Sequence, residues 1–121
     1  MKYLCLAYYD VPAFDTLTPA QLEALGPSCK PHDEALRATG KLVANGSLGT
    51  QARVVRTRSG KASITDGPYV ETKEQVGGLF IVEARDFDEA VAIASKHPAA
   101  QIGEELGWVV EVRPIETWLE P

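Results

Sequence analysis

The chain has 121 residues, of which 45% are hydrophobic and 24% are charged, and its formal net charge is −5. Its length suits one domain spanning residues 1–121, and its composition is that of a globular protein rather than a disordered one. Binding to a nucleic-acid backbone begins with a basic patch, and this acidic chain has no run of basic residues, so we expect no nucleic-acid ligand.

The N-terminal segment predicts a buried strand over residues 3–9, which are aromatic and apolar and are followed by Asp10 and Pro12. Cys5 lies inside this segment, where a thiol acts as a small hydrophobic side chain. The segment is too short to span a bilayer and lacks the small-residue cleavage site of a signal peptide. We therefore expect a cytoplasmic protein with no membrane partner.

A helix is predicted to begin at Thr18 and Pro19, because threonine caps free backbone N–H groups and proline fits the first helical turn. Pro27 and Pro31 are expected to break or kink it, since proline lacks the backbone donor and clashes with the preceding turn. The pattern thus predicts a second helical stretch over residues 31–39, ended by the glycine that follows.

The middle of the chain has the alternation and turn residues of short strands. We expect extended segments at residues 42–44, 48–55 and 62–65, with turns at 45–46 and 59–60. Arg53, Arg56 and Arg58 alternate with apolar or small residues, which indicates a strand with one solvated face.

The C-terminal half predicts a strand, a helix and a strand. Residues 77–84 are apolar on both faces, which is typical of a central strand. Asp86 is placed to cap a helix that Pro98 ends, and His97 is expected to contact the last carbonyl groups of that helix. Residues 107–115 form the last strand, and Pro114 indicates an edge position.

This order approximates the β-α-β-β-α-β pattern of the ferredoxin-like α+β fold, with helices on one face of an antiparallel sheet. The strands that are apolar on both faces would leave an exposed hydrophobic surface on the other side of the sheet. A homodimer that packs sheet against sheet is the simplest way to cover it.

The segment TDGPYVETKEQVGG, residues 65–78, resembles the signature of the DGPF type of YCII-related proteins, with Tyr69 where that signature has Phe. The stretches MKYLCLAYYD, LRATG, LFIVEARDFDEA and VEVRP are also similar to that family, so the resemblance spans nearly the whole chain. It implies a ferredoxin-like fold assembled as a dimeric α/β barrel.

The resemblance leaves two functions open. Some relatives act on ring acids derived from chlorinated aromatic compounds, which implies an enzyme, whereas frequent gene neighbours imply a regulatory partner of an extracytoplasmic-function sigma factor. The shorter relatives also have a His–Asp pair in a pocket. Here Cys29 stands where their His falls, and His32 comes later in the sequence. That pair is therefore not carried over to His32.

The signature itself concentrates polar groups. Asp66 is a candidate general base, because neighbouring carboxylate and ammonium groups shift the pKa of a carboxyl group in opposite directions. Tyr69, Glu71 and Lys73 are candidates for binding a small anionic substrate. The alternative is structural: Asp-Gly-Pro is a turn sequence, and Glu71 with Lys73 can be a solvated ion pair.

His32 is a second candidate acid–base residue, since imidazole titrates near neutral pH. The two histidines lie far apart in the sequence and no His, Cys and carboxylate cluster has ligand spacing, so we expect no metal site. Two hypotheses follow. The first is a cofactor-independent enzyme that transfers protons on a small organic acid, and the second is a small-molecule-binding or regulatory protein without turnover.

Overall fold

The computed structural model describes residues 1–121 and contains one principal sheet. Its strands are antiparallel and follow the order β2-β5-β1-β6, with bounds Leu42–Ser47 for β2, Glu74–Glu83 for β5, Lys2–Asp10 for β1 and Val109–Pro114 for β6. A separate two-stranded sheet pairs β3, Arg53–Arg58, with β4, Lys61–Asp66.

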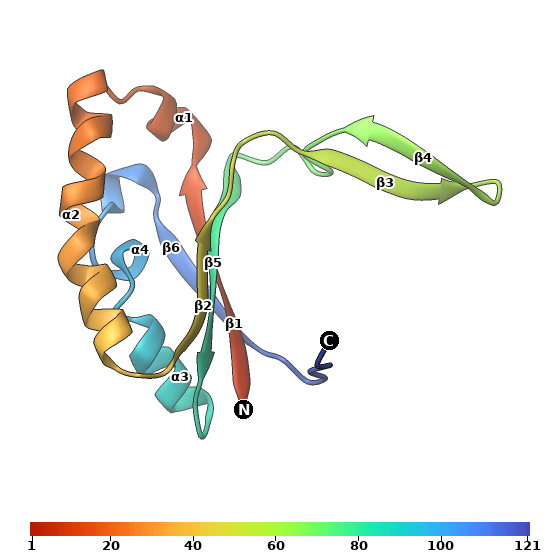
Figure 1. Ribbon diagram of the computed structural model, residues 1–121. Helices are drawn as coiled ribbons and strands as arrows, with labels where there is room; N and C mark the ends of the chain where they lie inside the picture. Colours follow the sequence, from red (N-terminus) through yellow and green to blue (C-terminus); the bar gives the residue numbers. More distant parts are fainter.

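Helices cover one face of the principal sheet (Figure 1). They are α1, Val11–Asp15; α2, Pro19–Ala38; α3, Phe87–Ala94; and α4, Pro98–Gln101, followed by a short 3₁₀ turn at Glu104–Leu106. Without the β3–β4 hairpin, the order of strands and helices and the position of each strand in the sheet are those of the ferredoxin-like fold. The predicted α+β class and antiparallel sheet are therefore confirmed.

The core lies between the sheet and the helices. Cys5 and Phe80 come from the two central strands and Leu36 from α2, and all three are fully buried. Burial raises the pKa of the Cys5 thiol to about 12, so this cysteine stays protonated and serves as packing.

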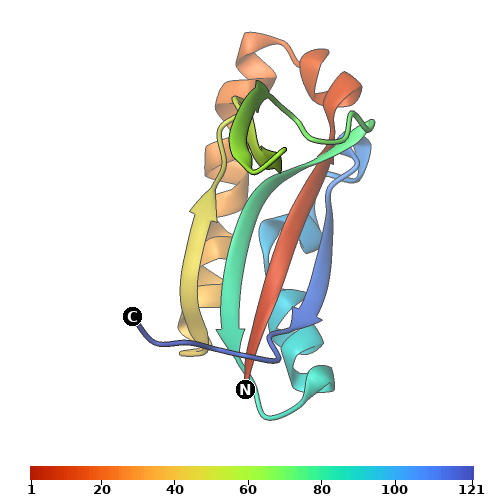
Figure 2. The same cartoon turned by 90° about the vertical axis from the view of Figure 1, so that its right-hand side faces the viewer.

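The opposite face of the sheet has no helix on it. Leu4 pairs with Ile81 and Leu6 with Leu79 in register, so these half-buried side chains share that face. The C-terminal segment crosses one end of the face (Figure 2), where the Lys2 ammonium lies 5.1 Å from the centre of the Trp118 ring. We call this surface the open face.

The predicted break in the long helix is wrong, because α2 continues through both internal prolines. Pro27 and Pro31 are one turn apart and exposed, so water can reach the carbonyl groups that each proline leaves without a donor. The start of α2 is as predicted. The Thr18 hydroxyl accepts a hydrogen bond from the Gln21 backbone N–H, and the Gln21 side-chain oxygen accepts one from the Thr18 backbone N–H.

The predicted turn at residues 45–46 is also wrong. Asn45 and Gly46 lie within β2 and pair with Phe80 and Leu79, and the chain leaves the sheet only after Ser47. The chain then extends into the β3–β4 hairpin, which projects away from the body on the side of the open face (Figures 1 and 2).

Pro98 begins a helix, whereas the sequence predicted that it ends one. Helix α3 begins at the Asp86 cap, as expected, but ends at Ala94, before Pro98. Pro98 occupies the first turn of α4, and His97 caps the start of that helix instead of contacting the last carbonyl groups of α3.

Candidate functional site

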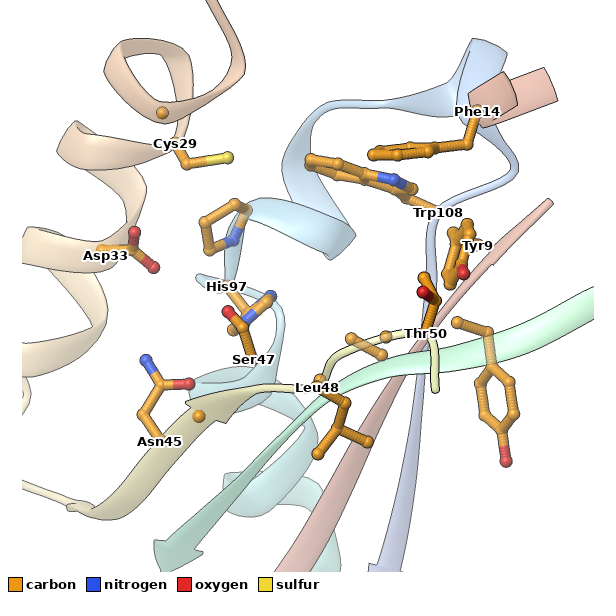
Figure 3. Close-up of a pocket in the computed structure, with 17 residues that line it drawn as sticks. Tyr9, Phe14, Cys29, Asp33, Asn45, Ser47, Leu48, Thr50, His97 and Trp108 are labelled. Carbon is orange, nitrogen blue, oxygen red and sulfur yellow. The ribbon is translucent and has the colours of Figure 1, made fainter. Parts of the chain in front are cut away.

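A cavity of about 630 Å³ lies between α2 and the end of the sheet that carries the start of the hairpin. Its walls come from β1, α1, α2, β2 with the loop after it, β5, the cap and start of α4 and the residue before β6 (Figure 3). Apart from Tyr8, Tyr9 and Trp108, the lining residues with reactive or polar side chains are Cys29, Asp33, Asn45, Ser47, Thr50 and His97.

His97 is held in one orientation by two contacts. Its ring stacks on Phe80 with centroids 4.4 Å apart and an interplanar angle of 4°. Its Nδ1 accepts a hydrogen bond from the Ala99 backbone N–H at 3.0 Å, which caps α4. The second contact fixes the tautomer: because Nδ1 accepts, the proton of the neutral ring is on Nε2.

Burial lowers the pKa of His97 below its ordinary value, and the charge of Asp33 opposes this in part. The backbone N–H at Nδ1 acts in the same direction as burial, since an imidazolium would place a second proton against it. His97 is therefore a neutral hydrogen-bond donor near neutral pH.

Asp33 and Cys29 lie one helical turn apart on α2 and face the ring of His97 across the cavity (Figure 3). Both are half-buried. Burial, with a smaller contribution from the Asp33 charge, raises the pKa of the Cys29 thiol. Cys29 is therefore an uncharged wall of the cavity rather than a nucleophile, because the thiolate is the reactive form.

The other end of the cavity is aromatic. Tyr9 and Phe14 meet edge to face with ring centroids 5.4 Å apart, and Trp108 lies beside Phe14 (Figure 3). The cavity thus has an apolar end suited to a flat ring and a polar end where Asp33 faces His97.

Asp33 is the one formally charged side chain among the lining residues, which include no lysine and no arginine.

No group of three or more His, Cys, Asp or Glu side chains is arranged to hold a metal ion. No helix is both long and apolar enough to cross a membrane.

The residues predicted from the signature lie outside this cavity. Asp66, Tyr69 and Glu71 are exposed at the base of the hairpin, and the Tyr69 ring is 5.2 Å from the Arg56 guanidinium. Lys73 is paired with Asp10, with 3.0 Å between Nζ and Oδ2. That carboxylate also caps α1 by accepting from the Ala13 amide, and this bond, then Lys73, lowers the pKa of Asp10.

The signature segment makes its own hydrogen bonds. The Gly67 N–H donates to the Ala52 carbonyl at 2.8 Å, and a Cβ at Gly67 would lie 2.9 Å from that of Ala52. The Gln75 side chain donates to the carbonyl groups of Val70 and Thr72. These contacts close the loop at the base of the hairpin, so the conformation of this segment has a structural explanation.

His32 is half-buried on α2 and does not line the cavity, so the structure does not bring it together with Asp66. The pair that faces the cavity, Asp33 with His97, was not among the predicted site residues. Two signals in the sequence fit it: the spacing of Cys29 and Asp33 on one helical face, and a histidine directly before a proline, where a helix can begin.

The fold and this cavity define a small ferredoxin-like α+β protein with a pocket between its sheet and its helices. The family model of the YCII-related domain matches residues 1–119, and the chain belongs to that family. An uncharacterized protein of Rhizobium meliloti (strain 1021) is 37% identical over 62 residues, which cover 45% of this chain and 50% of that protein. The match thus spans about half the length of this curated relative.

Among solved structures, the chain is similar to 5-chloro-2-hydroxyhydroquinone dehydrochlorinase from Burkholderia phenoliruptrix AC1100, in complex with 2,5-dihydroxybenzoquinone. The TM-score is 0.47 and the identity 18%, over 100% of this chain and 96% of the other. At this level the likeness does not bear on the activity of this chain. None of the comparisons supports the sigma-factor partnership.

Proposed function

We propose that the protein is an acid–base enzyme that removes a proton from a small, planar organic compound bound in the cavity. The observation that carries the proposal is the pairing of Asp33, a half-buried carboxylate, with the neutral His97 ring on the facing wall. A carboxylate is a proton acceptor, and an imidazole N–H is a donor to an oxygen that becomes negative.

The proton transfer needs only these two groups. Asp33 accepts a proton from a carbon next to a carbonyl group, or from a hydroxyl group of the substrate. The electrons of the broken bond move onto the substrate oxygen, and that oxygen accepts a hydrogen bond from Nε2–H of His97. Return of the proton from Asp33 to another atom of the substrate completes a tautomerisation.

The charge of the cavity narrows the substrate class. A carboxylate substrate would meet the Asp33 charge with no cationic side chain on the lining to compensate it. The small organic acid expected from the sequence is therefore proposed to be a weak acid, such as a phenol, an enol or a diketone, that binds in its neutral form. Its ring would lie against the aromatic end formed by Tyr9, Phe14 and Trp108.

A two-stage experiment tests the proposal. A thermal-shift screen of phenols, cyclic diketones and matched carboxylic acids identifies binders, because a ligand of the native state raises the melting temperature. Proton NMR in deuterated buffer then follows exchange of the substrate C–H group. We expect neutral enolisable compounds to bind and to exchange faster with the protein than without it. Binding limited to carboxylates, or no acceleration of exchange, would count against the proposal.

The state of His97 gives a prediction for stability against pH. Its folded pKa is lowered, so below the unfolded value of about 6.5 the unfolded chain binds a proton that the folded chain does not. The free energy of unfolding should fall as pH drops below that value, until the folded pKa is passed. Urea unfolding of wild type and His97→Asn from about pH 8 to pH 5 measures this.

His97→Asn keeps a side chain that can cap α4 but removes the titration. We expect its unfolding free energy to depend less on pH than that of wild type in this range. Asp33→Asn should make the unfolding free energy depend more strongly on pH. The Asp33 charge raises the pKa of His97, so removing it lowers that pKa further below the unfolded value. An unchanged pH dependence in His97→Asn would show that the ring titrates alike in both states.

A further inference from the structure

The last two residues of the signature segment, Gly77 and Gly78, are the part of it that reaches the cavity. Both belong to β5, which is a central strand of the principal sheet. Neither glycine has a side chain that could take part in the proton transfer. They contribute space to the cavity rather than a chemical group.

Gly78 lies on the floor of the cavity. It is paired in register with Ala7 of β1 and Ser47 of β2, and both of these residues also line the cavity. Phe80 is two positions further along β5, so it shares a face of the sheet with Gly78, and Phe80 is buried beneath the helices. A side chain at position 78 would therefore project from the sheet into the cavity.

The space above Gly78 is open. The three atoms nearest to an added Cβ are the Gly46 carbonyl oxygen at 3.1 Å, the Ala7 Cβ at 3.9 Å and the Ser47 Cα at 4.0 Å. All three belong to the neighbouring strands, and none comes from the helices on the facing wall. This space is thus part of the cavity and is not filled by the core.

Gly78 also lies between the two ends of the cavity. On one side of it along β5, the Phe80 ring stacks on His97 at the polar end. On the other side, a Cβ at Gly77 would lie 2.9 Å from Cδ1 of Tyr9, so the Tyr9 ring at the aromatic end packs against this glycine. Figure 3 shows His97 and Tyr9 on opposite sides of the cavity. A compound that reaches from one end to the other must pass over Gly78.

We propose that Gly78 is a specificity-determining residue that lets a flat compound larger than one ring span the cavity. This inference rests on the proposed function, in which the compound contacts Asp33 and His97. One part of the compound lies against Tyr9, and its acidic group lies at Asp33. A side chain at position 78 would divide the cavity and leave room only for a smaller compound at one end.

The size of the cavity supports this substrate class. Its volume of about 630 Å³ lies within the range of roughly 300–1,000 Å³ that is typical of sites for drug-sized ligands. A single six-membered ring with one hydroxyl group fills only a small part of that volume. The substrate class is therefore a flat weak acid about the size of two fused rings.

Binding of phenol and 2-naphthol to the full chain near neutral pH tests the proposal, because these neutral compounds differ by one fused ring. Isothermal titration calorimetry gives both dissociation constants for each variant. We expect wild type to bind 2-naphthol more tightly than phenol. In Gly78→Ala this preference should fall by about tenfold or more, since one methyl group in a pocket discriminates by that order. The preference is a ratio measured within one variant, so a general loss of stability does not change it.

Gly49→Ala is the matched control. Gly49 is exposed in the loop after β2, does not line the cavity, and has nothing within 4 Å of an added Cβ. Its preference for 2-naphthol should equal that of wild type. Ala7→Val adds bulk to the same part of the floor from β1, without the contact that a Cβ at Gly78 makes with the Gly46 carbonyl, and it should also lower the preference. Circular dichroism checks that each variant folds.

A folded Gly78→Ala variant that keeps the wild-type preference for 2-naphthol overturns the proposal. If that variant does not fold, an Ala7→Val variant with the wild-type preference overturns it. So does a wild-type chain that binds neither compound or binds phenol at least as tightly as 2-naphthol, or a Gly49→Ala control that loses the preference equally. Failure of the proposed proton transfer is a separate result. If wild type shows the expected preference but accelerates no exchange, the cavity is not an enzyme site and the role of Gly78 stands.

Discussion

We expect Asp33→Asn to lower the turnover of the substrate found by screening by about a hundredfold or more. The substitution removes the carboxylate that accepts the proton but keeps the size of the side chain. Asp33 makes no hydrogen bond or ion pair that the change would break, and it is only half-buried, so the fold should remain. Steady-state rates of exchange or tautomerisation for wild type and variant measure the effect.

Glu34→Gln is the matched control for this experiment. It removes an acid from the next position of α2, where the side chain is exposed and does not line the cavity. Its rate should equal that of wild type, whereas His97→Asn should lose rate because the developing negative charge loses its donor. If Asp33→Asn retains the wild-type rate, Asp33 is not the base. If Asp33→Asn binds the ligand as tightly as wild type and wild type shows no turnover, the cavity binds the ligand without catalysing a reaction.

The sheet could be predicted from the sequence because its signals are local. Residues 77–84 are apolar on both faces, and the strand they form is central; Pro114 ends a strand, and that strand is at the edge. The wrong predictions came from residues that usually interrupt a helix or a strand, because their effect depends on their surroundings. Pro27 and Pro31 do not end α2 because both are exposed, and the Asn45-Gly46 pair does not turn because β5 pairs with it.

The candidate site could not be predicted in the same way. The signature predicted a site at Asp66 and its neighbours because polar residues are dense there. In the structure Asp66 is exposed, and hydrogen bonds from the Gly67 N–H to Ala52 and from the Gln75 side chain to Val70 hold this loop. Asp33 and His97 are 64 positions apart and come from α2 and from the cap of α4. Their meeting depends on how two helices pack on one sheet, which no local pattern encodes.

We expect Gly103→Ala to destabilise the protein by about 2–4 kcal/mol, because it combines a backbone cost with a side-chain clash. Gly103 is buried and has a φ of 80°, in the left-handed region that disfavours a side chain. A Cβ there would lie 2.5 Å from Cδ2 and Cε3 of the Trp108 indole. The indole must then move, and because Trp108 lines the aromatic end of the cavity, ligand affinity should fall together with stability.

Gly40→Ala separates the two causes. Gly40 has a φ of 70°, but nothing lies within 4 Å of the added Cβ, so this variant has only the backbone cost of about 1–2 kcal/mol. Unfolding in urea gives the free energy of unfolding for each variant, and the excess for Gly103→Ala measures the clash with the indole. The double variant Gly103→Ala/Trp108→Leu should show a smaller loss than the sum of its single changes, since a shorter side chain relieves the contact. Equal losses at positions 40 and 103 would mean that Trp108 adjusts freely, and that the wall of the cavity is not fixed by this glycine.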